Sequence, residues 1–298
     1  MDPARPIPSL TLDLQAIAKE PDLLSDSGLL WSDDDVPLHE RGVELSWLSD
    51  FVWTVYRDWH RVLEKHESQT RASNYFDWVP EPGPLPFPPG QEMTPEFLVR
   101  DVIRPLSRGP VSPLYALVPH ECRGRPDLFV SHPWSNHLVG NAFATLQALI
   151  SPLRERGPVK FVWLDVVSYN QHHVEGIAAD MKAVVAAIGR VGIPMINAVP
   201  FSRLWCLWEL LCAHVAQAEV AVFEPSGSAY DIGYVARVFQ DEWESVERAA
   251  TTLPADREQI LGAMVSTFGS VAKADEHVRQ LVSSMLSKDS DKPWKRPR

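Results

Sequence analysis

The feature that most constrains the fold is the alternation, from Asp127 onward, of short apolar runs with amphipathic segments. Apolar runs of this length predict buried strands, and the segments between them have the spacing of helices. Strands that alternate with helices are typical of a parallel sheet covered on both faces. The sequence therefore predicts an α/β fold, a flavodoxin-like parallel sheet flanked by helices. The expected strands are 127–131, 159–165, 193–199 and 219–225, and the expected helices are 142–153, 177–191 and 205–218.

The rest of the chain divides by composition. Residues 1–39 carry prolines, serines and an acidic run, so we expect a poorly ordered N-terminus. Residues 40–120 predict a helical N-terminal region, interrupted by a Pro-rich connector at 81–90. Residues 127–225 form the α/β domain, and 226–298 predict a helical C-terminal extension with helices at 242–250, 256–268 and 275–286.

The N-terminal region contains two predicted helices. The first runs from Val43 to His66, because apolar residues recur there at helical spacing. Its apolar face must pack on another part of the protein, and we expect the α/β domain or the C-terminal extension to cover it. The second helix begins after Thr94 and ends near Pro105. The face of the first helix includes Trp47, Phe51, Val55 and Trp59.

Charge and cysteine usage exclude several classes of protein. A net charge of -11 disfavours non-specific binding to nucleic acid or to an anionic membrane. The three cysteines form no CxxC pair, so we expect neither a disulfide framework nor a zinc ribbon. The absence of a GxGxxG or P-loop motif argues against a Rossmann dehydrogenase or a P-loop enzyme. No secretory signal is recognisable, and we expect a cytoplasmic protein.

Three segments fall just past the ends of predicted strands. They are 129–136 (FVSHPWSN), 162–173 (VWLDVVSYNQHH) and 202–214 (SRLWCLWELLCAH). In sheets of this kind the working groups sit on loops at the carboxyl ends of the strands. We therefore expect Glu209 to line a cleft there, within reach of residues 131–136 and 165–173.

Glu209 stands in the run WCLWELLC, where almost every neighbour is apolar. Such surroundings cost the carboxylate its solvation and should raise its affinity for a proton. The carboxyl group is then either paired, for instance with Arg203, or poised for chemistry. The alternative is that Glu209 faces solvent at the rim of its helix while the tryptophans fill the core.

The same run resembles motifs of two known families. Plant-type TIR domains carry a similar W-C-L-x-E-L run, and an animal axon-degeneration NADase places a tryptophan four residues before its glutamate, as Trp205 stands to Glu209. Fungal heterokaryon-incompatibility (HET) domains carry R-x-W-x-x-x-E, which Arg203, Trp205 and Glu209 satisfy. In the TIR family this glutamate cuts the nicotinamide–ribose bond of NAD.

The other two segments resemble HET domains as well. The HET pattern W-I-D-x-x-C-I-N-Q is similar to 163–171. The HET opening, L-S-Y-x-W-G, is similar to the chain from Val130, with histidine at the aromatic position. Pro133 stands where TIR domains have an arginine. The matching residues are Trp163, Asp165, Asn170 and Gln171 in the first pattern and Ser131, His132 and Trp134 in the second.

The resemblance implies an enzyme that cleaves the nicotinamide–ribose bond of NAD or a related nucleotide, as a hydrolase or a transferase. Glu209 would be catalytic, NAD would be the substrate, and neither a cofactor nor a metal would be needed. Each of the other residues that match the motifs could instead have an ordinary structural role, as a turn cap, a loop hydrogen bonder or a core side chain. The substrate-binding residues so implied are Trp205, Ser131, His132, Trp134, Asp165, Asn170, Gln171 and Arg203.

Two other functions fit the same motifs. A non-catalytic TIR- or HET-type module would act in signalling or cell death by assembling with other chains. A nucleoside glycosyl or deoxyribosyl transferase would use a similar carboxylate on free nucleosides. For the enzyme the expected partners are a small nucleotide and further copies of the chain, with neither nucleic acid nor membrane.

Overall fold

A computed structural model describes most of the α/β domain and of the C-terminal extension, and parts of the N-terminal region. The described residues are 36–48, 50–52, 95, 98–103, 114–134, 159–171, 176–194, 199–223, 232–251 and 254–286. Within them, six strands form one sheet in the order β2-β1-β4-β3-β5-β6. The strands are β1 (Gly42–Glu44), β2 (Arg123–Gly124), β3 (Leu128–Val130), β4 (Phe161–Trp163), β5 (Arg190–Pro194) and β6 (Glu219–Phe223).

The sheet is mixed, which corrects the expectation of an all-parallel sheet. Strands β3, β4, β5 and β6 run parallel, but β1 pairs antiparallel with both β4 and β2. Val43 lies opposite Val162, at a position where the sequence predicted the start of a helix. Three residues are too few to show the period of a strand. The helix that begins at Leu45 gave the whole stretch its helical spacing in the sequence, so the strand was not recognised. The N-terminal region therefore contributes a strand to the sheet as well as helices.

Most of the expected helices are found close to their predicted places. The helices expected at 177–191, 205–218, 256–268 and 275–286 are present with shifted ends. The helix expected at 242–250 is wrong, because the helix there ends at Glu242, and β5 begins three residues before the strand expected at 193–199. The segment 142–153 lies outside the described residues. The helices are α7 (Asp165–Ser168), α8 (Ile177–Ile188), α9 (Leu204–Val215), α10 (Ile232–Glu242), α11 (Pro254–Phe268) and α12 (Val271–Leu286).

Short helical turns complete the described part of the chain. The helix expected after Thr94 is represented by Pro95 and by a π-helical turn that ends at Ile103, near the predicted end. The turns are η2 (Leu38–Glu40), η3 (Leu98–Ile103), η4 (Leu114–Leu117), η5 (His120–Cys122) and η6 (Val199–Ser202).

Alternation along the central strands creates two hydrophobic cores, one on each face of the sheet. Leu128 and Val130 of β3 belong to one core, and Phe129 between them belongs to the other. On β4, Val162 and Trp163 divide in the same way. Successive side chains of a strand point to opposite faces, so a residue's parity decides which core it joins.

The first core includes the apolar stripe of the N-terminal region. Trp47 and Phe51 are buried and stack on each other with ring centroids 5.2 Å apart. They share a core with Leu128 and Val162, so this part of the N-terminal region packs directly on the sheet. Val55 and Trp59, the other members of the expected stripe, lie outside the described residues.

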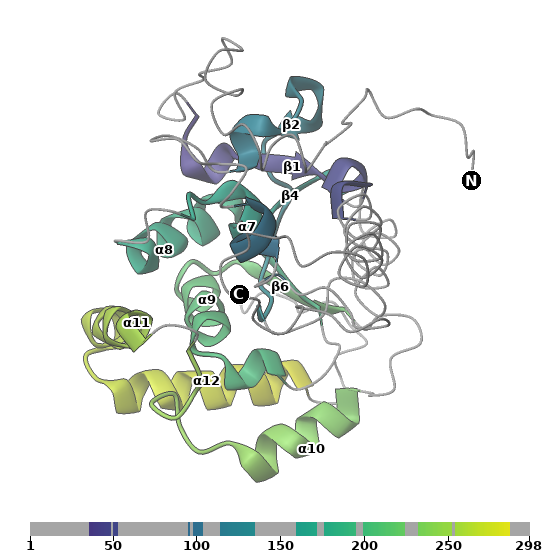
Figure 1. Cartoon of the computed structure of the whole chain (residues 1–298). Helices are drawn as coiled ribbons and strands as arrows, with labels where there is room; N and C mark the ends of the chain where they lie inside the picture. Colours follow the sequence, from purple (N-terminus) through teal and green to yellow (C-terminus); the bar gives the residue numbers. More distant parts are fainter. Residues whose placement is uncertain are drawn as a thin grey trace, which may run out of the picture.

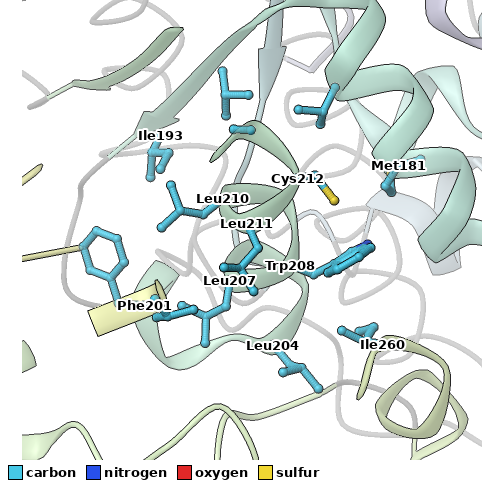
Figure 2. Packing of buried hydrophobic residues seen from close by; sticks show 14 of the residues in the cluster. Met181, Ile193, Phe201, Leu204, Leu207, Trp208, Leu210, Leu211, Cys212 and Ile260 are labelled. Atoms are coloured by element: carbon cyan, nitrogen blue, oxygen red, sulfur yellow. The ribbon is translucent and has the colours of Figure 1, made fainter. Parts of the chain in front are cut away.

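The second core is built around α9. Figure 2 shows Leu207, Leu211 and Trp208 of this helix among side chains that come from other elements, including Met181 of α8 and Ile260 of α11. The indole Nε1 of Trp208 also donates a hydrogen bond of 2.9 Å to the carbonyl of Ala178. Because nine of its twelve residues are buried, α9 packs against other parts of the protein on nearly every side.

The C-terminal extension packs around α9 as well. Figure 1 shows α11 and α12 beside α9, with α10 next to α12. The amide N–H of Leu204, at the start of α9, donates to the carbonyl of Ala250, which also forms an isolated bridge with Arg203. The extension therefore fixes the end of the helix from which Glu209 projects. Across the described residues, no helix is both long and apolar enough to cross a membrane.

Candidate functional site

The first two polar residues of the site follow the ends of two neighbouring strands. Phe129 of β3 pairs with Trp163 of β4, and both side chains lie in the core that contains α9. Ser131 comes one residue after the end of β3, and Asp165 comes two residues after the end of β4, as the first residue of α7. By parity, Ser131 follows the face of the sheet that α9 covers.

Glu209 reaches this point from α9. The hydroxyl of Ser131 donates a hydrogen bond of 2.5 Å to Oε2 of Glu209, although the two residues are 78 positions apart in the chain. Ser131 is fully buried, and Glu209 is only 7% exposed. The reading in which Glu209 faces solvent at the rim of its helix is therefore wrong.

Electrostatics make Glu209 an unusual carboxyl group. Burial raises its pKa well above the ordinary value of 4.5, and the nearby negative charge of Asp165 raises it further. The hydrogen bond from Ser131 acts in the opposite direction, because it favours the ionised form. Burial is the largest of these effects, so Glu209 holds its proton more tightly than a carboxyl group in water.

Asp165 is surrounded by N–H donors. Nε1 of Trp134 donates to its Oδ2 at 2.7 Å, and the amide of Val166 donates to its Oδ1 at the same distance. Its side chain is 20% exposed, which makes it the more accessible of the two carboxyl groups. Trp134 and Asp165, both expected at the site, are thus in direct contact.

His132 is the third side chain beside this pair. Its Nε2 lies 3.7 Å from Oδ1 of Asp165, beyond hydrogen-bond distance. The side chain is 8% exposed, and among the described residues its buried Nε2 has no hydrogen-bond partner. Buried polar atoms are seldom left in that state, so this nitrogen has unused capacity for a hydrogen bond.

The residues that follow β4 have mainly structural contacts. Gln171 is buried and donates from Nε2 to the carbonyl of Asp165 at 2.7 Å, which fixes the turn that carries this carboxylate. Asn170 is half-buried one position earlier. Trp163 is fully buried, stacks on Phe129 and donates from Nε1 to the carbonyl of Leu38, as expected of a core tryptophan.

Arg203 and Trp205 lie at the beginning of α9. Nε1 of Trp205 donates to Asp256 of α11 at 2.9 Å, and its half-buried ring packs against the second core. This contact joins α9 to the C-terminal extension and was not expected from the sequence. Burial raises the pKa of the nearby Cys206 thiol, and the positive charge of Arg203 opposes part of that rise.

Cys206 belongs to the same group of side chains, although sequence reasoning did not include it. Burial raises the pKa of its thiol, Glu209 raises it further, and a hydrogen bond with Ser131 partly opposes both. Its position three residues before Glu209 was the available signal, because residues at that spacing share one face of a helix.

The described residues contain no group of three or more His, Cys, Asp or Glu side chains that could hold a metal ion. Three other histidines in or next to the expected site segments, His137, His172 and His173, lie outside the described residues. Comparison with protein-family models, curated proteins and solved structures gave no match to this chain. The resemblance to TIR and HET domains therefore rests on the motifs, and the site rests on its own geometry.

Proposed function

We propose that the protein cleaves the N-glycosidic bond between nicotinamide and ribose in NAD or a related nucleotide, as a hydrolase or a transferase. The observation that carries this proposal is the buried carboxyl of Glu209, hydrogen-bonded to Ser131 and close to the charge of Asp165. Two carboxyl groups next to the ends of neighbouring parallel strands suit a reaction in which positive charge develops on a sugar.

The chemistry follows from the substrate. Nicotinamide in NAD is a cationic leaving group, so its departure needs little help from an acid. The barrier lies in the oxocarbenium-like charge that grows on the ribose. A Glu209 carboxylate held in a site with little water would stabilise that charge or trap it covalently, and water or another acceptor would complete the reaction.

The order of the strands supports the part of the proposal that concerns the fold. The four parallel strands lie in the order β4-β3-β5-β6, in which the second strand along the chain precedes the first. This order supports a flavodoxin-like, TIR-like arrangement to which β1 and β2 add an antiparallel edge. We propose NAD as the substrate, with no metal or cofactor, and a cytoplasmic protein that can form homo-oligomers.

A nucleoside glycosyl or deoxyribosyl transferase is the second candidate, and one observation favours it. Neutral purines and pyrimidines are poor leaving groups unless an acid protonates them. The raised pKa of Glu209 keeps a proton available for that purpose, while Asp165 could stabilise the sugar cation. Cleavage of adenosine or cytidine without cleavage of NAD would favour this candidate.

The decisive experiment is incubation of the purified protein with NAD, followed by chromatography for nicotinamide and ADP-ribose products. Glu209→Gln keeps the size and hydrogen bonding of the side chain but removes its charge. We expect kcat to fall about 10²-fold or more, the scale on which one preorganised electrostatic group acts.

Glu258→Gln is the matched control, because Glu258 is an exposed carboxylate on α11. It should leave kcat unchanged. Full NAD-cleaving activity in the Glu209→Gln protein would contradict the assignment of the site. Absence of turnover in the unmodified protein, together with concentration-dependent assembly, would favour the non-catalytic signalling module.

A further inference from the structure

We propose that the Asp165–Glu209 pair is a receptor for a planar organic cation of the N-alkylpyridinium class, and that this cation binds as Glu209 gives up its proton. The choice of cation rests on the proposed function, since the nicotinamide ring of NAD belongs to this class. The coupling between binding and proton release rests on the arrangement of the side chains.

The two carboxyl groups differ in what surrounds them. Asp165 accepts N–H hydrogen bonds on both oxygens, from Trp134 and Val166, and is partly exposed. Glu209 is buried between apolar neighbours of α9 and accepts one from the Ser131 hydroxyl. When two carboxylates share a site, each disfavours the ionisation of the other, and the more buried one keeps the proton. Glu209 is that member.

A bound cation changes this balance. Positive charge beside the pair favours the ionised form of Glu209, so its proton passes to the solvent as the cation enters. Apolar surroundings favour a weakly hydrated organic cation with delocalised charge over a small inorganic ion, which would lose more hydration energy. A neutral ligand of the same shape has no such advantage. The site should therefore select oxidised NAD over its neutral dihydro form.

His132 provides an independent observation in favour of a ligand at the site. Its Nε2 is buried, lies 3.7 Å from Asp165 and has no hydrogen-bond partner within the described part of the chain. A ligand that carries an amide beside its cationic ring offers both a donor and an acceptor, so it could supply the missing partner in either protonation state of the imidazole. Nicotinamide rings have this substituent.

Several other charged or titratable groups surround Glu209, and they must be distinguished in any test. The segment after β3 contributes His132, and the residue before α9 contributes Arg203. The helix itself contributes the thiols of Cys206 and Cys212, whose pKa values are raised by burial and by Glu209. Lys182 of α8 lies close enough to lower the pKa of Cys212. A variant at Glu209 separates its proton from those of the others.

Calorimetric titration with 1-methylnicotinamide tests the proposal without any reaction, because this cation has no ribose to cleave. The full-length protein is titrated between pH 5 and pH 8, at each pH in two buffers that differ in ionisation enthalpy. We expect proton release on binding, approaching one proton per site at the acidic end. Binding should tighten by up to about tenfold per pH unit, because only the ionised fraction of Glu209 is competent. Neutral nicotinamide should bind more weakly and release no proton.

Variants test whether the released proton comes from Glu209. Glu209→Gln should remove both the proton release and the pH dependence, and Asp165→Asn should shift the pH dependence to lower pH. Glu258→Gln should match the unmodified protein, and thermal melting checks that each variant is folded. The proposal is overturned if nicotinamide binds as tightly as its methylated form, or if binding releases no proton across this range. If the protein cleaves NAD but binds 1-methylnicotinamide without releasing a proton, this inference alone is overturned. If 1-methylnicotinamide binding releases a proton but NAD is not cleaved, the proposed function alone is overturned.

Discussion

The buried position of Glu209 makes its negative charge unfavourable for folding. Burial and the charge of Asp165 raise its pKa in the folded protein above the ordinary value of 4.5. The folded protein therefore binds more protons than the unfolded chain at pH values between the ordinary and the raised pKa. The stability that Glu209 contributes is fully present below about pH 4.5 and is lost as the pH rises through the raised pKa.

Glu209→Gln should remove this loss, because glutamine stays neutral at every pH. We expect the variant to be more stable than the unmodified protein at pH 8 and to lose that advantage near pH 4.5. An advantage of ~1 kcal/mol would raise Tm by about 2–4 °C in a protein of this size. Thermal melting of both proteins across this pH range measures the difference. A difference in Tm between the two proteins that stays the same at every pH would contradict the prediction.

The sequence indicated some of the residues that lie together at the site, such as Ser131, Asp165 and Glu209, but not how they would bond. Ser131 and Asp165 follow strand ends, and the side of Ser131 could have been inferred from the alternation along β3. The partner of Ser131 could not, because the hydrogen bond to Glu209 depends on where α9 crosses the sheet. The bond between Trp205 and Asp256 is hidden for the same reason, since it joins segments 51 positions apart.

At the scale of elements, β1 depends on a close approach of backbones that only glycine permits. A Cβ added to Gly42 would lie 2.8 Å from the nitrogen and 2.9 Å from the Cα of Pro126, and closer still to the carbonyl oxygen of Gly124. These are backbone atoms in or next to the paired strand β2, so they cannot move aside as a flexible side chain could.

Gly42→Ala should therefore destabilise the protein by about 1–3 kcal/mol, the usual cost of overpacking. Gly262→Ala is the matched control, because Gly262 lies within α11 and an added Cβ there would meet no atom within 4 Å. Alanine in a helix is favoured over glycine by roughly 0.5–1 kcal/mol, so the control should stabilise. Chemical denaturation of both variants gives the two free energies of unfolding, and changes of the same sign would contradict the prediction.

Elements with a long run of regularly spaced apolar residues could be predicted from the sequence more completely than short elements. Helix α12 buries Ala274, Val278, Val282 and Leu286, a stripe with a spacing of four residues that the sequence displays openly. Strand β1 has three residues and no visible period, and it lies in a stretch whose apolar spacing is helical. In β5 the sequence RVGIP begins with Arg190, which pairs with Glu219, and this charged start hid the first residues of the strand.

For the whole molecule, the α/β domain shares its two cores with the segments on either side of it. One core joins Leu128 and Val162 of the sheet to Trp47 and Phe51 of the N-terminal region. The other joins α9 to residues of α11 and α12 such as Ile260 and Val282. The composition boundaries near residues 120 and 226 are therefore not boundaries of the cores, and sequence alone could not reveal this, because each shared core is made of contacts between distant segments.

A fragment of residues 127–225 should for this reason fail to fold by itself. It would lack β1 and the adjoining Leu45, whose amide donates to the carbonyl of Lys160, and it would leave β4 with an unpaired edge. It would also expose the faces of α9 that α11 and α12 cover, and each large apolar side chain left in water forgoes about 1.5–3 kcal/mol. That loss over several residues exceeds the few kcal/mol by which a domain of this size is usually stable.

The test compares the 127–225 fragment with residues 36–286 by circular dichroism and thermal melting. We expect a cooperative transition for the longer chain and none for the fragment. Limited proteolysis of the full-length protein gives the same information independently, because cutting near residue 120 or 226 should not release a stable body. A fragment of about 127–225 that survives proteolysis and melts cooperatively would show that the sheet needs neither neighbour, and that the shared cores contribute little to folding.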